Sequence, residues 1–162
     1  MEEQLVYRSY FSSPVGWIEL CATVKGLCSL YFTRGKSKPE RASALLKEAE
    51  RQVRGYFDKT RTVFSVPLDL QGTEFQKKVW NELLNIPFGN TISYLQLARR
   101  LGDEKVIRAA GRANGSNPVS IIVPCHRVIG SDGTLVGYGG GLDKKKWLLG
   151  FEGALKQKEL FA

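Results

Sequence analysis

The spacing of apolar residues changes at Gln71 and Gly72, and this change limits what the chain can fold into. Upstream, over 5–32, apolar side chains alternate with other residues, which predicts antiparallel strands with one buried face. An apolar stripe at helical spacing follows over 45–57, and alternation returns over 64–70 as one more strand or an extended linker. The first part of the chain therefore predicts a small sheet accompanied by one helix.

Beyond this point the apolar spacing is mostly helical. Thr73 with Gln76 and Ser93 with Gln96 have the separation of capping boxes, so each pair predicts the start of a helix. A glycine-containing turn and a helix over 104–114 follow the second of these helices. Together they make a helix-turn-helix pattern, which many helical hairpins share and which is a weak sign of DNA binding by itself.

These patterns predict an α+β fold in two domains. Residues 1–70 form an N-terminal domain with a small antiparallel sheet and a helix. Residues 71–162 form a C-terminal, mostly helical domain that contains the helix-turn-helix.

Charge and composition narrow the class of protein. The chain carries 24 Lys and Arg against 16 Asp and Glu, a net +8, which favours polyanionic partners but also suits an ordinary basic surface. No apolar run approaches the roughly 18 residues of a membrane span, and the first residues lack a secretion signal. We therefore expect no membrane association. The odd count of three cysteines predicts reduced thiols in the cytoplasm, or in the nucleus of a eukaryote.

A cysteine and the single histidine of the chain stand side by side. Cys125 and His126 follow 121–123, an apolar run that predicts a buried strand ended by Pro124. A cysteine nucleophile reacts as its thiolate and needs a base, and His126 is the only imidazole. Neighbours in an extended chain point to opposite sides, so the pair needs a turn or a bridging water. A carboxylate must also orient the imidazole, and Glu152 is one candidate among 16 acids.

Two further features leave alternatives open. A zinc site built from the cysteines and His126 is disfavoured, because Cys21 and Cys28 lack the usual short ligand spacing. The helix over 107–115 is rich in Ala and Gly and carries two arginines. Such a helix indicates either close packing or a backbone that approaches a groove.

The motifs of the second half resemble those of the O6-alkylguanine-DNA alkyltransferases, and they occur in the expected order. The resemblance covers 72–153, whereas 1–70 is similar to the variable N-terminal domain of that family only in general form. The matching segments are Gly72–Gln76, Val79-Trp80, Pro87–Gly89, Ser93-Tyr94, Asn117-Pro118, Ile121–Ile129 around Pro-Cys-His-Arg-Val, Tyr138–Leu142, Lys145–Leu149 and Glu152-Gly153.

This resemblance implies a single-turnover DNA repair reaction and assigns chemical roles to five residues. Cys125 is the alkyl acceptor, and His126 activates it through a water. Glu152 orients the histidine. Asn117 helps to hold the active-site turn, and Tyr94 aids proton delivery to the leaving guanine. The implied reaction removes the alkyl group from O6-alkylguanine, mainly O6-methylguanine, and needs no cofactor and no metal.

The resemblance also implies a DNA surface and a substrate pocket. The implied partner is double-stranded DNA that contains alkylated guanine, bound through its minor groove by a monomer. Arg108 replaces the flipped base in the stack, beside the small residues Ala109 and Gly111, while Arg112 adds a charge where some relatives have a small residue. The implied pocket residues are Ser120, Val128, Tyr138, Gly139, Gly140 and Lys145.

Two departures from the family concern the implied pocket. Ser120 replaces a proline found in some relatives, and Gly139 replaces a larger serine, so the size of alkyl group that fits is open. A cysteine hydrolase built on Cys125 and His126 remains the main alternative, and a non-catalytic DNA binder is a third reading. Turnover would distinguish the hydrolase, whereas the alkyltransferase reacts once per molecule.

Overall fold

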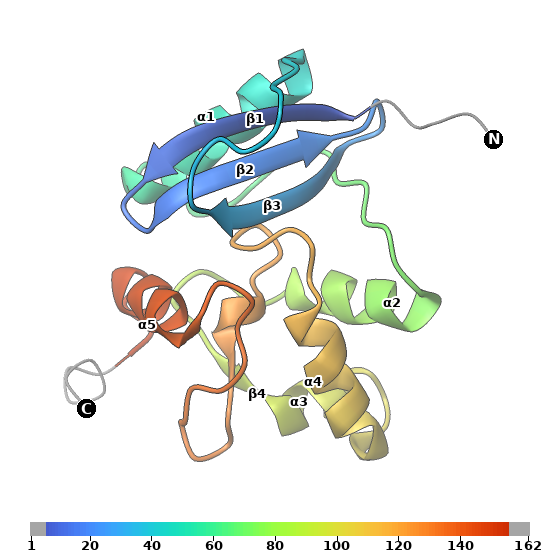
Figure 1. Ribbon diagram of the computed structural model, residues 1–162. Coiled ribbons are helices and arrows are strands. Elements are labelled where there is room, and N and C mark those ends of the chain that lie inside the picture. The colour runs from blue at the N-terminus through green and yellow to red at the C-terminus, as the bar shows by residue number, and fades with distance from the viewer. Residues whose placement is uncertain (1–5, 156–162) are drawn as a thin grey trace. The chain divides into compact units, whose positions relative to one another are not determined.

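The computed structural model describes residues 6–155, which divide into two compact units (Figure 1). The first unit comprises the chain up to Gln71 together with Pro118–Ile122, and the second comprises Gly72–Asn117 and the chain from Val123 onward. The sequence placed 118–122 in the C-terminal domain, whereas the structure places this short segment with the first unit.

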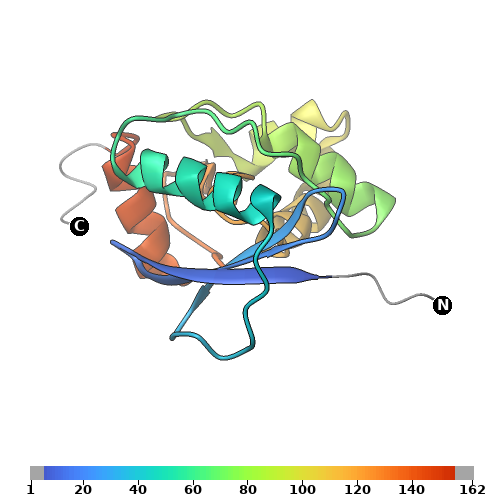
Figure 2. The ribbon, with the colours of Figure 1, turned by 90° about the horizontal axis from the view of Figure 1, so that it is seen from above.

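The first unit is a three-stranded antiparallel sheet with one helix. Strands β1 (Tyr7–Ser13), β2 (Gly16–Ala22) and β3 (Leu27–Thr33) lie in the order β1-β2-β3. Helix α1 (Ala44–Phe57) runs along one face of this sheet and contacts all three strands (Figure 2). The alternation in the sequence thus reports a sheet with one face turned to α1, as predicted.

Two short segments outside the sheet make single bridges to the free side of β3. Leu68 makes a single parallel bridge to Leu27, so 64–70 is an extended linker rather than a full strand. Val119 makes a similar bridge to Leu30 of β3. Both sides of β3 therefore have backbone partners, which satisfies groups that an open sheet edge would expose.

The second unit holds short strands and most of the helices. Both predicted capping boxes are present, at Thr73 and at Ser93, because each hydroxyl accepts from an N–H three residues on while the glutamine side chain returns the bond. The elements are α2 (Glu74–Leu83), β4 (Ile92–Ser93), α3 (Tyr94–Arg100), the 3₁₀ turn η1 (Glu104–Val106), α4 (Ile107–Gly115), the 3₁₀ turn η2 (Cys125–Arg127), β5 (Val128–Ile129) and α5 (Leu142–Phe151).

Helices α3 and α4 pack against each other and form the predicted helix-turn-helix (Figure 1). The turn between them contains Gly102 with a φ of +96°, a conformation that favours glycine. Trp80 of α2 donates its indole N–H to the carbonyl oxygen of Ala113 at 2.8 Å, which fastens α4 to α2. Over residues 6–155, none of the helices has the length and apolar character needed to cross a membrane.

The prediction of a buried strand over 121–123 is wrong. These residues are buried, as their composition indicated, but they form a turn in which Ile121 has a φ of +73°. The N–H of Ile122 donates to the carbonyl oxygen of Ser120, and that of Cys125 donates to Val123, in place of a sheet ladder. Apolar composition predicts burial, but it does not distinguish a strand from a buried turn.

Candidate active site

The backbone around Cys125 is held by the end of α4. Asn117 donates from Nδ2 to the carbonyl oxygen of Val123 at 2.7 Å, and Asn114 donates to the carbonyl oxygen of Cys125 at 3.3 Å. Cys125 begins η2, and it is 5% exposed. Because η2 is a 3₁₀ turn, Cys125 and His126 do not point in opposite directions as neighbours in a strand would. One of the two conditions for this pair, a turn in the chain, is therefore present at these residues.

His126 and Glu152 form a buried pair. Nε2 of His126 lies 2.7 Å from Oε2 of Glu152, and both side chains are completely buried. A carboxylate accepts from N–H, so this contact places the imidazole proton on Nε2. Nδ1 of His126 then carries the lone pair, and it has no hydrogen-bond partner in the described part of the chain. The imidazole therefore presents a free basic nitrogen.

Arg127 is a part of this site that sequence reasoning missed. Its Nε donates to Oε1 of Glu152 at 2.8 Å and its Nη2 donates to Oε2 at 3.0 Å, while Nη1 donates to the carbonyl oxygen of Ile86 at 2.7 Å. Asn114 was missed as well. The sequence offered one signal for each residue: Arg127 belongs to the Pro-Cys-His-Arg run, and Asn114 lies close to Asn117 in the chain. No local pattern predicts which groups either residue contacts.

The electrostatics favour a neutral thiol beside a neutral imidazole. Burial raises the pKa of the Cys125 thiol, and the opposing effects of Asn117 and Lys145 are smaller. Desolvation lowers the pKa of His126 despite its bond to Glu152. Burial by itself would raise the pKa of Glu152, but His126 and Arg127 hold it well below its usual range. The resting thiol therefore needs a base, and the imidazole is available as one.

Tyr94 is carried to the site by a short parallel strand pair. Ile92 and Ser93 of β4 pair with Val128 and Ile129 of β5, directly after η2, and Tyr94 is the next residue along the chain. Its hydroxyl donates to the carbonyl oxygen of Val136 at 2.9 Å. Burial and the nearby Cys125 raise the pKa of this phenol above its ordinary value. Tyr94 is therefore a proton donor rather than a phenolate at neutral pH.

Lys145 is fully buried, with its ammonium group inside a ring of backbone carbonyls. Its Nζ donates to the carbonyl oxygens of Val128 at 2.7 Å, Val136 at 2.8 Å and Gly137 at 3.4 Å. Burial lowers the pKa of this ammonium to about 8. The residue predicted as a pocket wall thus ties the loop after β5 to α5.

The other predicted pocket residues differ in burial. Val128 is buried, Tyr138 and Gly140 are half-buried, and Gly139 is exposed. The N–H of Gly141 donates to the carbonyl oxygen of Tyr138, which turns this loop into α5. Ser120 belongs to the first unit, where its N–H donates to the carbonyl oxygen of Leu30. Its role in the pocket stays a prediction.

One face of α4 is exposed and carries the predicted DNA residues. Arg108 and Arg112 are exposed, and Ala109 and Gly111 are half-buried, whereas Ala110, Ala113 and Asn114 are buried on the opposite face. A Cβ added to Gly111 would lie 3.7 Å from the ring of Tyr94. Gly111 of α4 therefore lies beside Tyr94, a residue of the candidate site.

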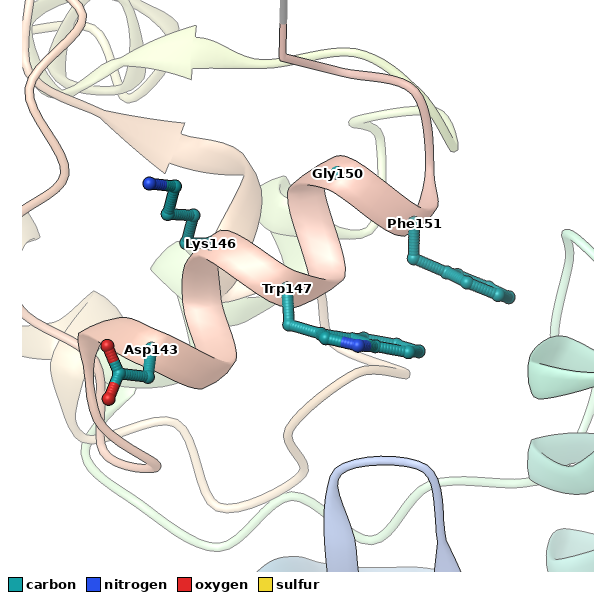
Figure 3. Close-up of a pocket in the computed structure, with 5 residues that line it drawn as sticks. All are labelled: Asp143, Lys146, Trp147, Gly150 and Phe151. Carbon is teal, nitrogen blue, oxygen red and sulfur yellow. The ribbon is translucent and has the colours of Figure 1, made fainter. Parts of the chain in front are cut away.

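Helix α5 has a second face that takes no part in this arrangement. A surface hollow is lined by Asp143, Lys146, Trp147, Gly150 and Phe151 (Figure 3). The Trp147 and Phe151 rings stack there with their centroids 4.9 Å apart. None of the predicted site residues lines this hollow: Lys145 lies on the buried face of α5, and the buried Glu152 directly follows the helix.

Comparison with known proteins identifies the class of molecule. Models of two domains match in succession: the ribonuclease-like domain of 6-O-methylguanine DNA methyltransferase over 6–70, and the DNA binding domain of the same protein over 74–154. Fold and site therefore define a DNA-binding protein with a buried cysteine.

Individual relatives agree with this class. The methylated-DNA–protein-cysteine methyltransferase of Methanosarcina acetivorans is 45% identical over 92% of this chain and 99% of its own length. The solved O6-methylguanine methyltransferase of Mycobacterium tuberculosis is 40% identical, with a TM-score of 0.83 over 98% of this chain and 100% of that one. The same organism's OGT in complex with DNA gives a TM-score of 0.84 at 41% identity, over 96% and 99% of the two chains. The chain belongs to the methylated-DNA–protein-cysteine methyltransferase family.

Proposed function

We propose that this protein repairs O6-alkylguanine, mainly O6-methylguanine, by moving the alkyl group to Cys125 once per molecule. The observation that carries the proposal is the buried Cys125 next to His126. Nδ1 of His126 has no hydrogen-bond partner among residues 6–155, and its Nε2 bonds to Glu152 at 2.7 Å. A thiol, a base and an orienting carboxylate are the parts that nucleophilic catalysis requires.

The reaction balances with the residues present. The thiol proton passes to Nδ1 of His126 through a water, and the thiolate sulfur attacks the alkyl carbon. The bond from that carbon to O6 breaks, and its electron pair stays with guanine, which takes a proton with the help of Tyr94. A thioether has no easy leaving group, so the protein is consumed. No cofactor enters any of these steps.

The DNA geometry follows from the exposed face of α4. The target base must leave the duplex stack, which costs a few kcal/mol. We place the small residues Ala109 and Gly111 against the minor groove, with Arg108 filling the space of the flipped guanine and Arg112 beside the backbone. One chain supplies every residue named here, so we propose a monomer. A reactive thiol also suits a reducing compartment such as the cytoplasm.

The proposal is tested with a duplex oligonucleotide that carries one O6-methylguanine. We expect one methyl group per protein molecule, located on the peptide that contains Cys125 by mass spectrometry, and a restored guanine in the DNA. Absence of methyl on Cys125 would refute the proposal. Release of several product equivalents per protein would favour the hydrolase reading instead.

Replacing Arg108, the residue proposed to fill the space of the flipped guanine, separates the effect on base flipping from the effect on alkyl transfer itself. We expect Arg108→Ala to slow transfer from duplex DNA by about tenfold or more, because extrusion then lacks a side chain to fill the stack. Transfer from free O6-methylguanine should be nearly unchanged. Single-turnover rates on the two substrates measure both effects.

A matched control removes an arginine far from α4 in the sequence. Arg34→Ala takes an exposed arginine from the first unit, and it should leave both rates close to those of the wild type. If Arg108→Ala slowed transfer from duplex DNA and from the free base equally, this would contradict the proposed role of Arg108 in filling the space of the flipped guanine.

A further inference from the structure

Arg127 shares the carboxylate that orients His126. Its guanidinium binds both oxygens of Glu152, at 2.8 and 3.0 Å, in the fork geometry that arginine forms with carboxylates. The Arg127 side chain is 6% exposed and that of Glu152 is fully buried. Glu152 therefore serves two partners, and the His126–Glu152 pair cannot be considered without the arginine.

The turn over 86–89 holds this arrangement in place. The sequence singled out Pro87–Gly89 as a motif, but the proposed reaction gives it no part. In the structure the carbonyl oxygen of Ile86 accepts from Nη1 of Arg127 at 2.7 Å, and the centroid of the Phe88 ring lies 5.8 Å from Cζ of Arg127. The N–H of Gly89 donates to Oε1 of Glu152 at 3.3 Å.

Glycine at position 89 allows this close approach. Gly89 has a φ of +84°, and a Cβ added there would lie 3.2 Å from the backbone oxygen of Glu152. A larger residue would be strained by its conformation and crowded by that oxygen. The turn over 86–89 thus binds both Arg127 and Glu152 through its backbone.

The charges that face His126 decide whether it can act as a base. Glu152 favours the imidazolium, whereas Arg127, Lys145 and the loss of solvent favour the neutral ring. With Arg127 present, the negative charge of Glu152 is already balanced. Without it, the buried carboxylate would still face His126 and would favour a proton there. An imidazolium has no lone pair with which to accept the proton of Cys125.

We propose that Arg127 is a positioning residue that fixes Glu152 on the 86–89 turn and keeps His126 unprotonated, and therefore able to deprotonate Cys125. This inference rests on the proposed function, because it concerns activation of the same thiol. It adds a fourth member to the set formed by Cys125, His126 and Glu152, and it gives the Pro87–Gly89 motif a purpose.

The titration of His126 tests the proposal directly, because the chain has a single histidine. In protein labelled with ¹⁵N-histidine, the ring nitrogen shifts in NMR spectra report the charge and tautomer of His126 alone. We expect the wild-type ring to be neutral at pH 7, with the proton on Nε2. In Arg127→Met the pKa of His126 should rise by about 1 to 3 pH units, since a balancing charge has been removed.

The rate of transfer to Cys125 should follow the titration. Because an imidazolium cannot act as the base, the rising limb of the rate against pH should move upward in Arg127→Met by the same number of pH units as the pKa of His126. Arg127→Lys keeps a charge but loses the fork, and we expect a smaller rise in the pKa of His126. Arg100→Met removes a guanidinium from a partly exposed pair with Glu82 and should leave the titration unchanged.

Three outcomes overturn the proposal: an Arg127→Met titration that matches the wild type, an Arg127→Lys titration that does so, or an unaltered pH profile of the rate. If Arg127→Met does not fold, Arg127→Lys decides the matter. A purely structural arginine would lower stability without moving the pKa of His126. The NMR titration needs no DNA, so wild-type Cys125 failing to take a methyl group would refute the proposed function and leave the titration result standing.

Discussion

Replacing Cys125 with serine should abolish alkyl transfer while leaving DNA binding in place. The hydroxyl has almost the shape of the thiol but is a far weaker nucleophile at neutral pH. Loss of a catalytic nucleophile lowers rates by factors on the order of 10⁴ or more. Single-turnover assays with methylated duplex and mobility-shift titrations on the same preparation measure the two properties separately.

The chain offers a matched control for this substitution. Cys28 lies half-buried in β3 as another free thiol, so Cys28→Ser should still take one methyl group per molecule. Methyl found on Cys28 or Cys21, or a Cys125→Ser protein that still reacts at a rate near that of the wild type, would contradict the assignment of the acceptor.

The second large effect is on stability, from Glu152→Gln. The substitution keeps the side-chain volume but removes the charge between Arg127 and His126, and it leaves a buried guanidinium without a counter-ion. Breaking a buried pair from one side costs about 3 to 5 kcal/mol. We expect the free energy of unfolding, measured by urea denaturation at pH 7, to fall by about that amount, and transfer to Cys125 to slow as well.

The pH dependence of stability gives this prediction a sign. The pKa of Glu152 is held well below its usual range in the folded protein. Its stabilisation is therefore complete above the unfolded-state pKa of about 4.3 and is lost as the pH falls toward the folded-state pKa. The Glu152→Gln protein should lose less stability in acid than the wild type does.

An exposed pair provides the comparison for Glu152. Glu104 contacts Arg99 at 2.6 Å, but both side chains are more than half exposed. Such pairs contribute about 0 to 1 kcal/mol, so Glu104→Gln should change the unfolding free energy by no more than that. Equal losses from the two substitutions would show that burial of the Arg127–Glu152 pair has no special weight.

Local patterns predicted much of the fold. The α+β class, the sheet, the helix-turn-helix and both capping boxes are present, because strand alternation, helical spacing and capping act within a few residues. The run over 121–123 shows the limit of this reasoning. It is apolar and buried, but pairing of 119 with Leu30 and the bend at Ile121 are decided by contacts far away in the sequence.

The candidate site divides in a similar way. The sequence by itself determined that Cys125 could have one histidine as its base, since the chain contains no other, and the family resemblance selected Glu152 from the acids. Tertiary structure decided which groups those residues meet: Arg127 reaches Ile86 and Glu152, Asn114 holds Cys125, and Lys145 points its ammonium into backbone carbonyls. Residue type and spacing set what chemistry a side chain can perform. Pairing of buried polar groups depends instead on which distant segments the packed core brings within about 3 Å of one another.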